Sequence, residues 1–295
     1  MTEGRLLRPH TIDEALSERE QYGSDALPIA GGQSLLVMLR NKLIDPKVLL
    51  DLEPLGELRG LQRQAQVISI GAMTTFFQLL SSPDVQSAIP ILAQAASKVG
   101  STAIRNLGTI GGNLCHNELG ADLPPALLAL NSCAELRSRK GTRKVPLTEF
   151  FRDFFETAVT PEEILARVEI PALPQGARGA YIKHSISPED LAIAGVAVVL
   201  VADEEKNHVV RELRIGLGGV APVPLRATKA ETALNGKDLT DEAIRAAAEI
   251  AASETEPMSD PHASADYRRK MVKVLVRRAI AAVMGRGERN GYGKA

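Results

Sequence analysis

Two pairs of adjacent glycines stand at junctions between apolar segments of this chain. Gly31 and Gly32 separate a strand-like run from an amphipathic segment, and Gly111 and Gly112 occupy the same kind of junction further along. Glycine inside a helix or strand costs about 0.5–1 kcal/mol relative to alanine, so such pairs indicate a positive φ or a close backbone approach. Main-chain N–H groups in a glycine turn that opens a helix bind phosphate. Two such turns would suit a pyrophosphate, although a tight turn alone would also explain each pair.

Polar side chains that can bind phosphate accompany both pairs. The hydroxyl groups of Ser34 and Thr109 and the amide groups of Gln33 and Asn113 can all donate hydrogen bonds to phosphate oxygens. The first turn is followed by no Gly-Lys-Ser/Thr and is not G-x-G-x-x-G, so it is neither a Walker loop nor the usual nicotinamide-cofactor fingerprint. These donors therefore fit a diphosphate and not a transferable γ-phosphate.

The other side chains offer little catalytic equipment. Asp122 precedes Leu123-Pro124-Pro125, where it is most simply a helix N-cap, although its carboxylate could equally accept hydrogen bonds from ligand hydroxyls. No G-x-S-x-G elbow and no nucleophile–base set is present. The histidines lack metal-ligand spacing and are His10, His116, His184, His208 and His262. Such a chain fits a protein whose bound cofactor performs the chemistry, with no catalytic side chain and no metal of its own.

The first glycine pair is expected to lie within a βαβ-sized unit. A capping box at Thr11 opens a helix that Gly23 can end, and residues 26–30 form a buried strand. After the glycines, apolar residues recur at helical spacing over 35–43, and residues 47–52 return as a strand.

A second α/β segment is expected to carry the second glycine pair. Residues 56–76 predict a hairpin with Gly60 near its bend, followed by a helix capped by Thr74 or Thr75. Further expected elements are a helix within 89–101, a second hairpin turning at Lys140-Gly141 and a strand over 162–171.

The Pro/Gly-rich break at 171–180 is the clearest candidate for a domain boundary. Beyond it, residues 191–203 and 209–219 predict antiparallel strands joined by the charged turn 204–208. The apolar residues of the last helix recur at the helical period and are Val272, Leu275, Val276, Ala279, Ile280 and Val283. The basic residues beside that stripe indicate a surface helix docked on its own domain rather than a nucleic-acid contact.

Bulk composition describes an ordinary globular protein. The 295 residues are 44% apolar with a formal charge of -1, which gives no indication of nucleic-acid binding. No signal peptide and no membrane span is recognisable. The two cysteines, Cys115 and Cys133, do not form a disulfide framework or a metal-cluster motif, so we expect reduced, buried thiols and a cytoplasmic protein.

Four motifs span nearly the whole chain, in the order IAGGQSLLVMLRNKL, GAMTT, RNLGTIGGNLCHNELGADLPPALLAL and SDPHASADYRRKMVKVLVRRAI. They resemble the FAD-binding medium subunit of molybdenum hydroxylases, the group that includes aerobic carbon monoxide dehydrogenase and xanthine dehydrogenase. The resemblance implies an α+β protein with a two-subdomain FAD-binding domain of the vanillyl-alcohol-oxidase (PCMH) type, over residues 1–55 and 56–172. A C-terminal domain over 178–286, with a three-stranded antiparallel sheet and a helical bundle, and a tail at 287–295 would follow.

The resemblance also implies a set of FAD-binding residues. Asp122 would lie near the ribityl and ring end of the flavin, and Lys183 close to the isoalloxazine. Leu191 stands where carbon monoxide dehydrogenase has a tyrosine, which argues against carbon monoxide as the substrate. The residues expected to hold the pyrophosphate are Ala30, Gly31, Gly32, Gln33, Ser34 and Leu35 with Thr109, Ile110, Gly111, Gly112 and Asn113.

By the same resemblance, this chain is an oxidoreductase subunit with two partners. A large subunit would hold molybdopterin and the substrate, and a small subunit with two [2Fe–2S] clusters would pass electrons to FAD here, in a dimer of heterotrimers. Two alternatives stay open at this point: a self-sufficient flavin oxidase or reductase, and a non-catalytic scaffold that has kept the fold without flavin. The sequence names neither the substrate nor the electron acceptor.

Overall fold

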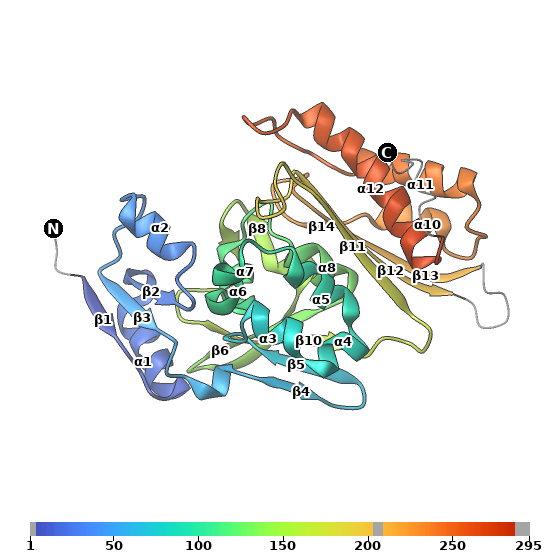
Figure 1. Cartoon of the computed structure of the whole chain (residues 1–295). Helices are drawn as coiled ribbons and strands as arrows, with labels where there is room; N and C mark the ends of the chain where they lie inside the picture. Colours follow the sequence, from blue (N-terminus) through green and yellow to red (C-terminus); the bar gives the residue numbers. More distant parts are fainter. Residues whose placement is uncertain (1–3, 203–208, 287–295) are drawn as a thin grey trace. The chain divides into compact units, whose positions relative to one another are not determined.

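A computed structural model describes residues 4–202 and 209–286 of the chain (Figure 1). The chain forms two compact units. The first unit comprises residues 1–88, 99–118 and 131–172, and the second comprises 89–98, 119–130 and 173–295. Two segments from the N-terminal half therefore belong to the second unit. The boundaries expected at 55, 172 and 178 divide the chain linearly and stay a prediction.

A small parallel sheet of order β1-β3-β2 begins the first unit. Its elements are β1 (Arg5–Leu7), α1 (Ile12–Tyr22), the 3₁₀ turn η1 (Gly23–Asp25), β2 (Ala26–Ile29), α2 (Leu35–Arg40) and β3 (Val48–Asp51). As predicted, the Thr11 side chain accepts from the Glu14 N–H to start α1, and Gly23 ends it with φ 54°. The strand, glycine turn, helix and strand expected from the sequence are confirmed.

The second sheet of this unit has the order β4-β5-β10-β6-β7. Its strands are β4 (Leu61–Arg63), β5 (Val67–Gly71), β6 (Cys133–Ser138), β7 (Gly141–Pro146) and β10 (Ile164–Pro171), all paired antiparallel. The predicted bend at Gly60 is wrong. The Gly60 carbonyl accepts from the Gly71 N–H at 2.9 Å, and the bend lies at 64–66, closed by the Gln64 N–H donating to Val67.

Short helices surround this sheet. Thr75 caps its helix in a full capping box with Gln78, as predicted. The remaining elements of the first unit are η2 (Gly56–Leu58), α3 (Phe76–Ser81), α4 (Pro83–Ala88), α6 (Thr102–Leu107), α7 (Ile110–His116), α9 (Leu147–Phe150), β8 (Phe151–Asp153) and β9 (Glu156–Thr157).

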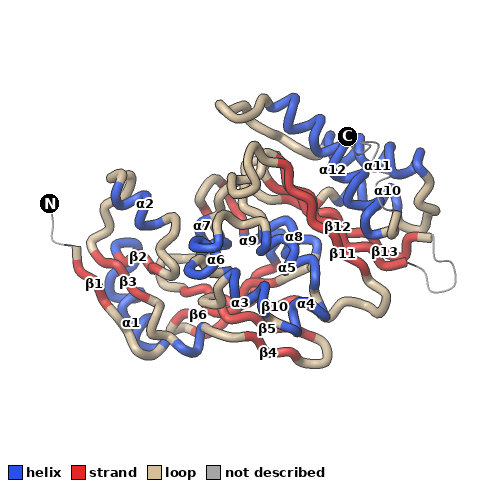
Figure 2. Tube along the Cα trace, in the orientation of Figure 1, coloured by secondary structure: helices blue, strands red, loops and turns tan. Residues whose placement is uncertain are grey.

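The second unit is built on an antiparallel sheet of order β11-β12-β13-β14, of which β11, β12 and β13 are labelled in Figure 2. Its elements are α5 (Pro90–Ser97), α8 (Leu123–Ala129), β11 (Arg178–His184), β12 (Ala194–Ala202), β13 (Val210–Gly218), β14 (Leu225–Arg226), α10 (Thr228–Leu234), α11 (Asp241–Ser253) and α12 (Ala265–Val283). The two-residue strand β14 makes the expected three-stranded sheet four-stranded. The predicted turn at 204–208 lies outside the described residues.

Helices cover both faces of this sheet. Val196 and Val198 of β12 pack into one core with α10, α11 and α12, and all six predicted apolar residues of α12 are buried there. On the other face, Gly216 of β13 lies against Pro125 of α8. Burial on both faces explains why β12 is apolar without alternation. Among the helices of the described residues, none is both long and apolar enough to cross a membrane.

Candidate functional site

The two glycine turns lie next to each other in the first unit. A Cβ on Gly31 would stand 1.8 Å from the carbonyl oxygen of Leu107, just before the second turn. A Cβ on Gly112 would stand 3.7 Å from the Cβ of Ala30. Gly31 is therefore required for the close approach of the two segments, whatever binds there.

The first turn presents unpaired main-chain N–H groups. Within residues 4–202 and 209–286, none of the five N–H groups from Gly31 to Leu35 has a protein acceptor. Gly32 has φ +69°, in the left-handed region, and the Gln33 side chain donates to the Gly31 carbonyl at 3.1 Å. A run of free N–H groups around a left-handed glycine is an anion-binding concavity.

The second turn differs from expectation. Four of its five N–H groups are already paired: Ile110 with the Thr74 carbonyl at 3.0 Å, Gly111 with the Ala72 carbonyl at 2.8 Å, Gly112 with the Thr109 hydroxyl at 3.0 Å and Asn113 with the Thr109 carbonyl at 3.0 Å. The second turn therefore does not offer the run of free main-chain N–H groups that was expected of both turns. These bonds seat α7 against the end of β5, and Gly111 permits the contact with Ala72.

The second turn can bind a ligand mainly through its side chains. The Asn113 Oδ1 atom is buried without a partner, and the Thr109 hydroxyl keeps its proton available because it only accepts from Gly112. A carboxamide can turn either its oxygen or its NH₂ group toward a ligand. One turn with free N–H groups, facing a turn with an unsatisfied amide, fits the diphosphate of a dinucleotide.

A buried arginine ties the first turn's strand to the larger sheet. From α1, the Arg19 guanidinium donates to the carbonyls of Gly23 and Ala26 beside β2. It also donates to the Thr160 carbonyl at 3.2 Å and the Glu163 carbonyl at 3.3 Å, just before β10. Four backbone acceptors, two at the start of β2 and two in the segment before β10, thus share one cation, which holds β2 and the glycine turn after it in place.

Asp122 and Lys183 form a buried ion pair in the second unit. The Lys183 Nζ atom lies 2.9 Å from Asp122 Oδ2, and each side chain is only 4% exposed. Lys183 also donates to the Lys98 carbonyl at 2.8 Å, and the Tyr181 hydroxyl donates to Asp122 Oδ1 at 2.7 Å. Burial raises the pKa of the Asp122 carboxyl to about 6, although Lys183 acts in the opposite direction. Asp122 does stand at the N-cap position of α8, as the simpler interpretation predicts, but its side chain makes no capping bond.

Helix α8 holds Asp122 in place. Every residue of α8 is buried, and Gly216 admits it, because a Cβ there would stand 2.0 Å from the Pro125 carbonyl oxygen. At its other end, Arg214 donates to the Ala129 carbonyl and Arg226 to the Leu128 carbonyl, both at 3.2 Å. Cations at the last carbonyls of a helix stabilise it.

Sequence reasoning missed Tyr181. It stands two positions before Lys183 on β11, so both side chains lie on one face of the strand. Gly195 on β12 leaves room for it, because a Cβ there would stand 2.7 Å from the Tyr181 hydroxyl. The sequence signal that could have identified Tyr181 is its position two residues before Lys183 in a strand, which places both side chains on the same face.

The predicted site residues thus fall into two groups. The eleven turn residues lie together in the first unit, and Asp122 lies with Lys183 in the second. Leu191, also in the second unit, is exposed. Both cysteines are free; Cys133 is only half-buried and Cys115 has exposed surface, although burial raises the pKa of the Cys115 thiol to about 12. No cluster of metal-ligating side chains occurs within the part of the chain that the structure describes.

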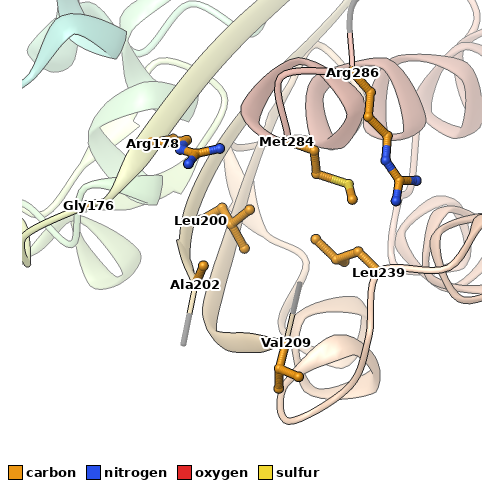
Figure 3. A pocket seen from close by; sticks show the side chains of 8 residues that line it. All are labelled: Gly176, Arg178, Leu200, Ala202, Val209, Leu239, Met284 and Arg286. Carbon is orange, nitrogen blue, oxygen red and sulfur yellow. The ribbon is translucent and has the colours of Figure 1, made fainter. Parts of the chain in front are cut away.

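A separate pocket of about 190 Å³ lies in the second unit (Figure 3). Leu200, Leu239 and Met284 surround it, and none of the predicted site residues does. Its two cations are engaged, Arg178 with the Val283 carbonyl and Arg286 with Asp241, each at 3.4 Å. The pocket therefore carries no evident anion site.

Comparison with known families agrees with the geometry of the turns. The family described as FAD binding domain in molybdopterin dehydrogenase matches residues 2–173. The CO dehydrogenase flavoprotein C-terminal domain matches residues 180–283. Together, the two matches contain every predicted site residue.

Individual relatives match over nearly their full lengths. The carbon monoxide dehydrogenase medium chain of Hydrogenophaga pseudoflava is 37% identical, over 94% of this chain and 96% of that protein. The 6-hydroxypseudooxynicotine dehydrogenase complex subunit alpha of Paenarthrobacter nicotinovorans is 34% identical, over 94% and 93%. A solved structure of carbon monoxide dehydrogenase from Hydrogenophaga pseudoflava superposes with a TM-score of 0.93 at 38% identity, covering 96% of this chain and 98% of that one. This chain therefore belongs to the family of FAD-binding medium subunits of molybdenum hydroxylases, and it is an oxidoreductase subunit.

Proposed function

We propose that this chain is the electron-transfer subunit of a heteromeric molybdenum and iron–sulfur hydroxylase, with FAD held between its two glycine turns. The observation that carries the proposal is the run of five unpaired N–H groups from Gly31 to Leu35, packed against the segment from Leu107 to Asn113. In a member of this family, the group that such a concavity fits is the FAD diphosphate.

The site residues contribute to FAD binding in different ways. The turn from Ala30 to Leu35 binds phosphate oxygens through its main chain, and Thr109 and Asn113 bind through their side chains. Ile110, Gly111 and Gly112 shape the cradle, since a Cβ on Gly111 would stand 2.6 Å from the Cβ of Ala72. Asp122 lies near the ribityl and ring end of FAD, and Lys183 lies close to the isoalloxazine. When bound, FAD supplies the redox chemistry of this subunit.

Electrons reach this subunit from a partner. In the proposed complex, a large subunit holds molybdopterin and oxidises the substrate, and a small subunit with two [2Fe–2S] clusters passes electrons to FAD, in a dimer of heterotrimers. The surface of α2 supports a partner-bound state. Three apolar residues on α2 or just after it are exposed, Leu36 by 48%, Val37 by 51% and Leu43 by 69%, whereas Leu35, Met38 and Leu39 are partly buried.

The substrate is determined outside this chain. Relatives of nearly equal identity are named for carbon monoxide and for 6-hydroxypseudooxynicotine, so similarity here does not follow the substrate. Leu191 argues against carbon monoxide. We also propose a cytoplasmic complex, which the two free thiols support.

One observation favours a second candidate, a scaffold subunit without flavin. The N–H groups of the second turn from Ile110 to Asn113 are satisfied within the protein, which is what a turn with no ligand would show. Coexpression with candidate large and small partner subunits separates the two functions. The purified active complex should contain FAD equimolar with this chain, whereas an active complex without flavin would support the scaffold. Turnover by this chain alone would instead indicate a self-sufficient flavin enzyme.

A further inference from the structure

Another buried arginine contacts the loops that lead to the Asp122–Lys183 pair. Arg268, in the first turn of α12, is 4% exposed. Its Nη1 atom donates to the Ile193 carbonyl at 2.6 Å and to the Gly219 carbonyl at 2.9 Å, and Nη2 pairs with Asp260. This orientation leaves its Nε–H buried without a partner. The guanidinium is thus committed to two backbone carbonyls from different loops.

Those two loops hold the start of α8. The Gly219 N–H donates to the Leu119 carbonyl at 2.9 Å, and the Ala192 N–H donates to the Gly120 carbonyl at 3.0 Å. Asp122 follows two residues after Gly120. Gly219 has φ +76°, and a Cβ there would stand 2.8 Å from the Ala192 carbonyl oxygen, so this junction is closely packed. Arg268 therefore holds two loops, and each loop donates one main-chain hydrogen bond to the segment just before Asp122.

The same turn of α12 contacts the strand that carries Lys183. The Tyr267 hydroxyl lies 2.9 Å from the Nε2 atom of His184, the residue after Lys183. The His184 carbonyl in turn accepts from the Ile193 N–H at 2.8 Å. Tyr267 and Arg268, which contact segments next to Lys183 and next to the start of α8, are thus consecutive on one helix.

Asp260 fixes the arginine from the other side. Its Oδ1 atom accepts from the N–H groups of His262 and Ala263, both at 2.9 Å, which leaves Oδ2 for Arg268. A carboxylate held in this way orients the guanidinium toward the two loop carbonyls. Removing the cation would leave those carbonyls and Asp260 without their shared donor.

We propose that Arg268 is a positioning residue for the Asp122–Lys183 pair, acting by locking the loops at Ile193 and Gly219 onto the start of α8. This inference rests on the proposed function only where it concerns flavin. The part that does not depend on flavin is that Arg268 stabilises the contact between these two loops and the start of α8, where Asp122 lies. Arg268 itself is not assigned any contact with FAD.

Arg214 provides a matched control. It is equally buried, at 5% exposed, it pairs with one carboxylate, Glu212, and it donates to a backbone carbonyl of α8, that of Ala129. It differs in acting at the end of α8 remote from Asp122. A merely structural role would make Arg268→Met and Arg214→Met alike.

The test compares Arg268→Met, Arg268→Lys and Arg214→Met in the assembled complex. Hydrogen exchange followed by mass spectrometry should quicken about tenfold or more in peptides covering 185–194 and 217–222 for Arg268→Met, the loss expected when bonds to a charged donor are removed. Arg268→Lys should restore part of that protection, and Arg214→Met should leave those peptides unchanged. The flavin reduction potential should shift in Arg268→Met and not in Arg214→Met.

Equal exchange in those two peptides for both methionine variants, at equal loss of thermal stability, would overturn the proposal. If Arg268→Met does not fold, Arg268→Lys takes its place in the comparison with Arg214→Met. The lysine ammonium group cannot reproduce all the bonds of the guanidinium, so exchange in the two peptides should still be faster than in Arg214→Met. A wild-type complex without flavin would refute the proposed function, whereas the exchange comparison would still test Arg268.

Discussion

Asp122 and Lys183 pair at 2.9 Å in a site from which water is almost excluded. The sequence analysis assigned Asp122 and Lys183 separately, and the structure shows that they form one ion pair. A carboxylate with one cation and one tyrosine hydroxyl as partners, inside the fold, is fixed in position but costly to ionise. Its protonation therefore affects the stability of the folded chain.

The pH dependence of stability should reveal this carboxyl. Its folded pKa is raised from 3.8 to about 6, so the folded state binds the extra proton between these values and stability falls as pH rises through them. The shift corresponds to about 3 kcal/mol. Relative to Asp122→Asn, the wild type should lose roughly that amount between pH 4 and pH 7 in urea unfolding followed by circular dichroism. A difference that is flat, or that grows with pH, would contradict the burial of Asp122.

Tyr181→Phe tests the same network from its other side. The tyrosine hydroxyl stabilises the charged carboxylate, so its loss should raise the pKa of Asp122 further. Carbon-13 NMR of labelled aspartate carboxyls measures this directly. An unchanged titration would show that the Tyr181 bond has no electrostatic role.

Asn113 should show a conflict between stability and binding. Its Oδ1 atom is buried and unsatisfied. Asn113→Leu should therefore stabilise the flavin-free protein by about 1 kcal/mol, because a buried unpaired carbonyl is removed. The same substitution should weaken FAD binding. Thermal melts without flavin and equilibrium dialysis with FAD measure the two effects.

Ser132→Ala is the matched control for Asn113. The Ser132 hydroxyl is also buried without a partner, in the same unit but outside both turns. It should stabilise the protein in the same way and leave FAD affinity unchanged. Equal FAD affinity for Asn113→Leu and Ser132→Ala would remove Asn113 from the site.

Arg19 should matter to both folding and flavin binding. Arg19→Met removes one donor from each of four backbone carbonyls and leaves a buried gap, which we expect to cost about 3 kcal/mol or more. Arg139→Met removes only an exposed pair with Glu20 and should cost less than about 1 kcal/mol. Urea unfolding of both variants checks this, and a small loss for Arg19→Met would show that β2 is held by packing alone.

Local signals in the sequence predicted most of the elements. The Thr11 and Thr75 caps, the strand at 26–30 and the apolar stripe of α12 depend on neighbours within a few residues, and all are present. The bend at Gly60 was misplaced because a positive-φ glycine can also sit beside a strand, as this one does at φ +84°. A local pattern cannot tell the two positions apart.

Tertiary partners account for what the sequence did not predict. The acceptors of the second turn, Ala72 and Thr74, lie far from it in sequence, so nothing near Gly111 indicated that its N–H was taken. The use of Asp122 as an ion-pair partner likewise depends on β11. The apolar face of α2 was recognisable, but its exposure was not, because periodicity shows that a face is apolar and not what covers it.

The central claim is that the main chain of the first turn binds the FAD diphosphate, and Gly32→Ala compared with Gly60→Ala tests it most directly. Both glycines have positive φ, +69° and +84°, so each alanine should cost about 1–2 kcal/mol of stability. Relief of that strain at position 32 turns the free N–H groups away from the ligand, whereas position 60 lies outside the turn. FAD content of the purified complex should fall for Gly32→Ala and remain at the wild-type level for Gly60→Ala. Full FAD content in both variants would contradict the account.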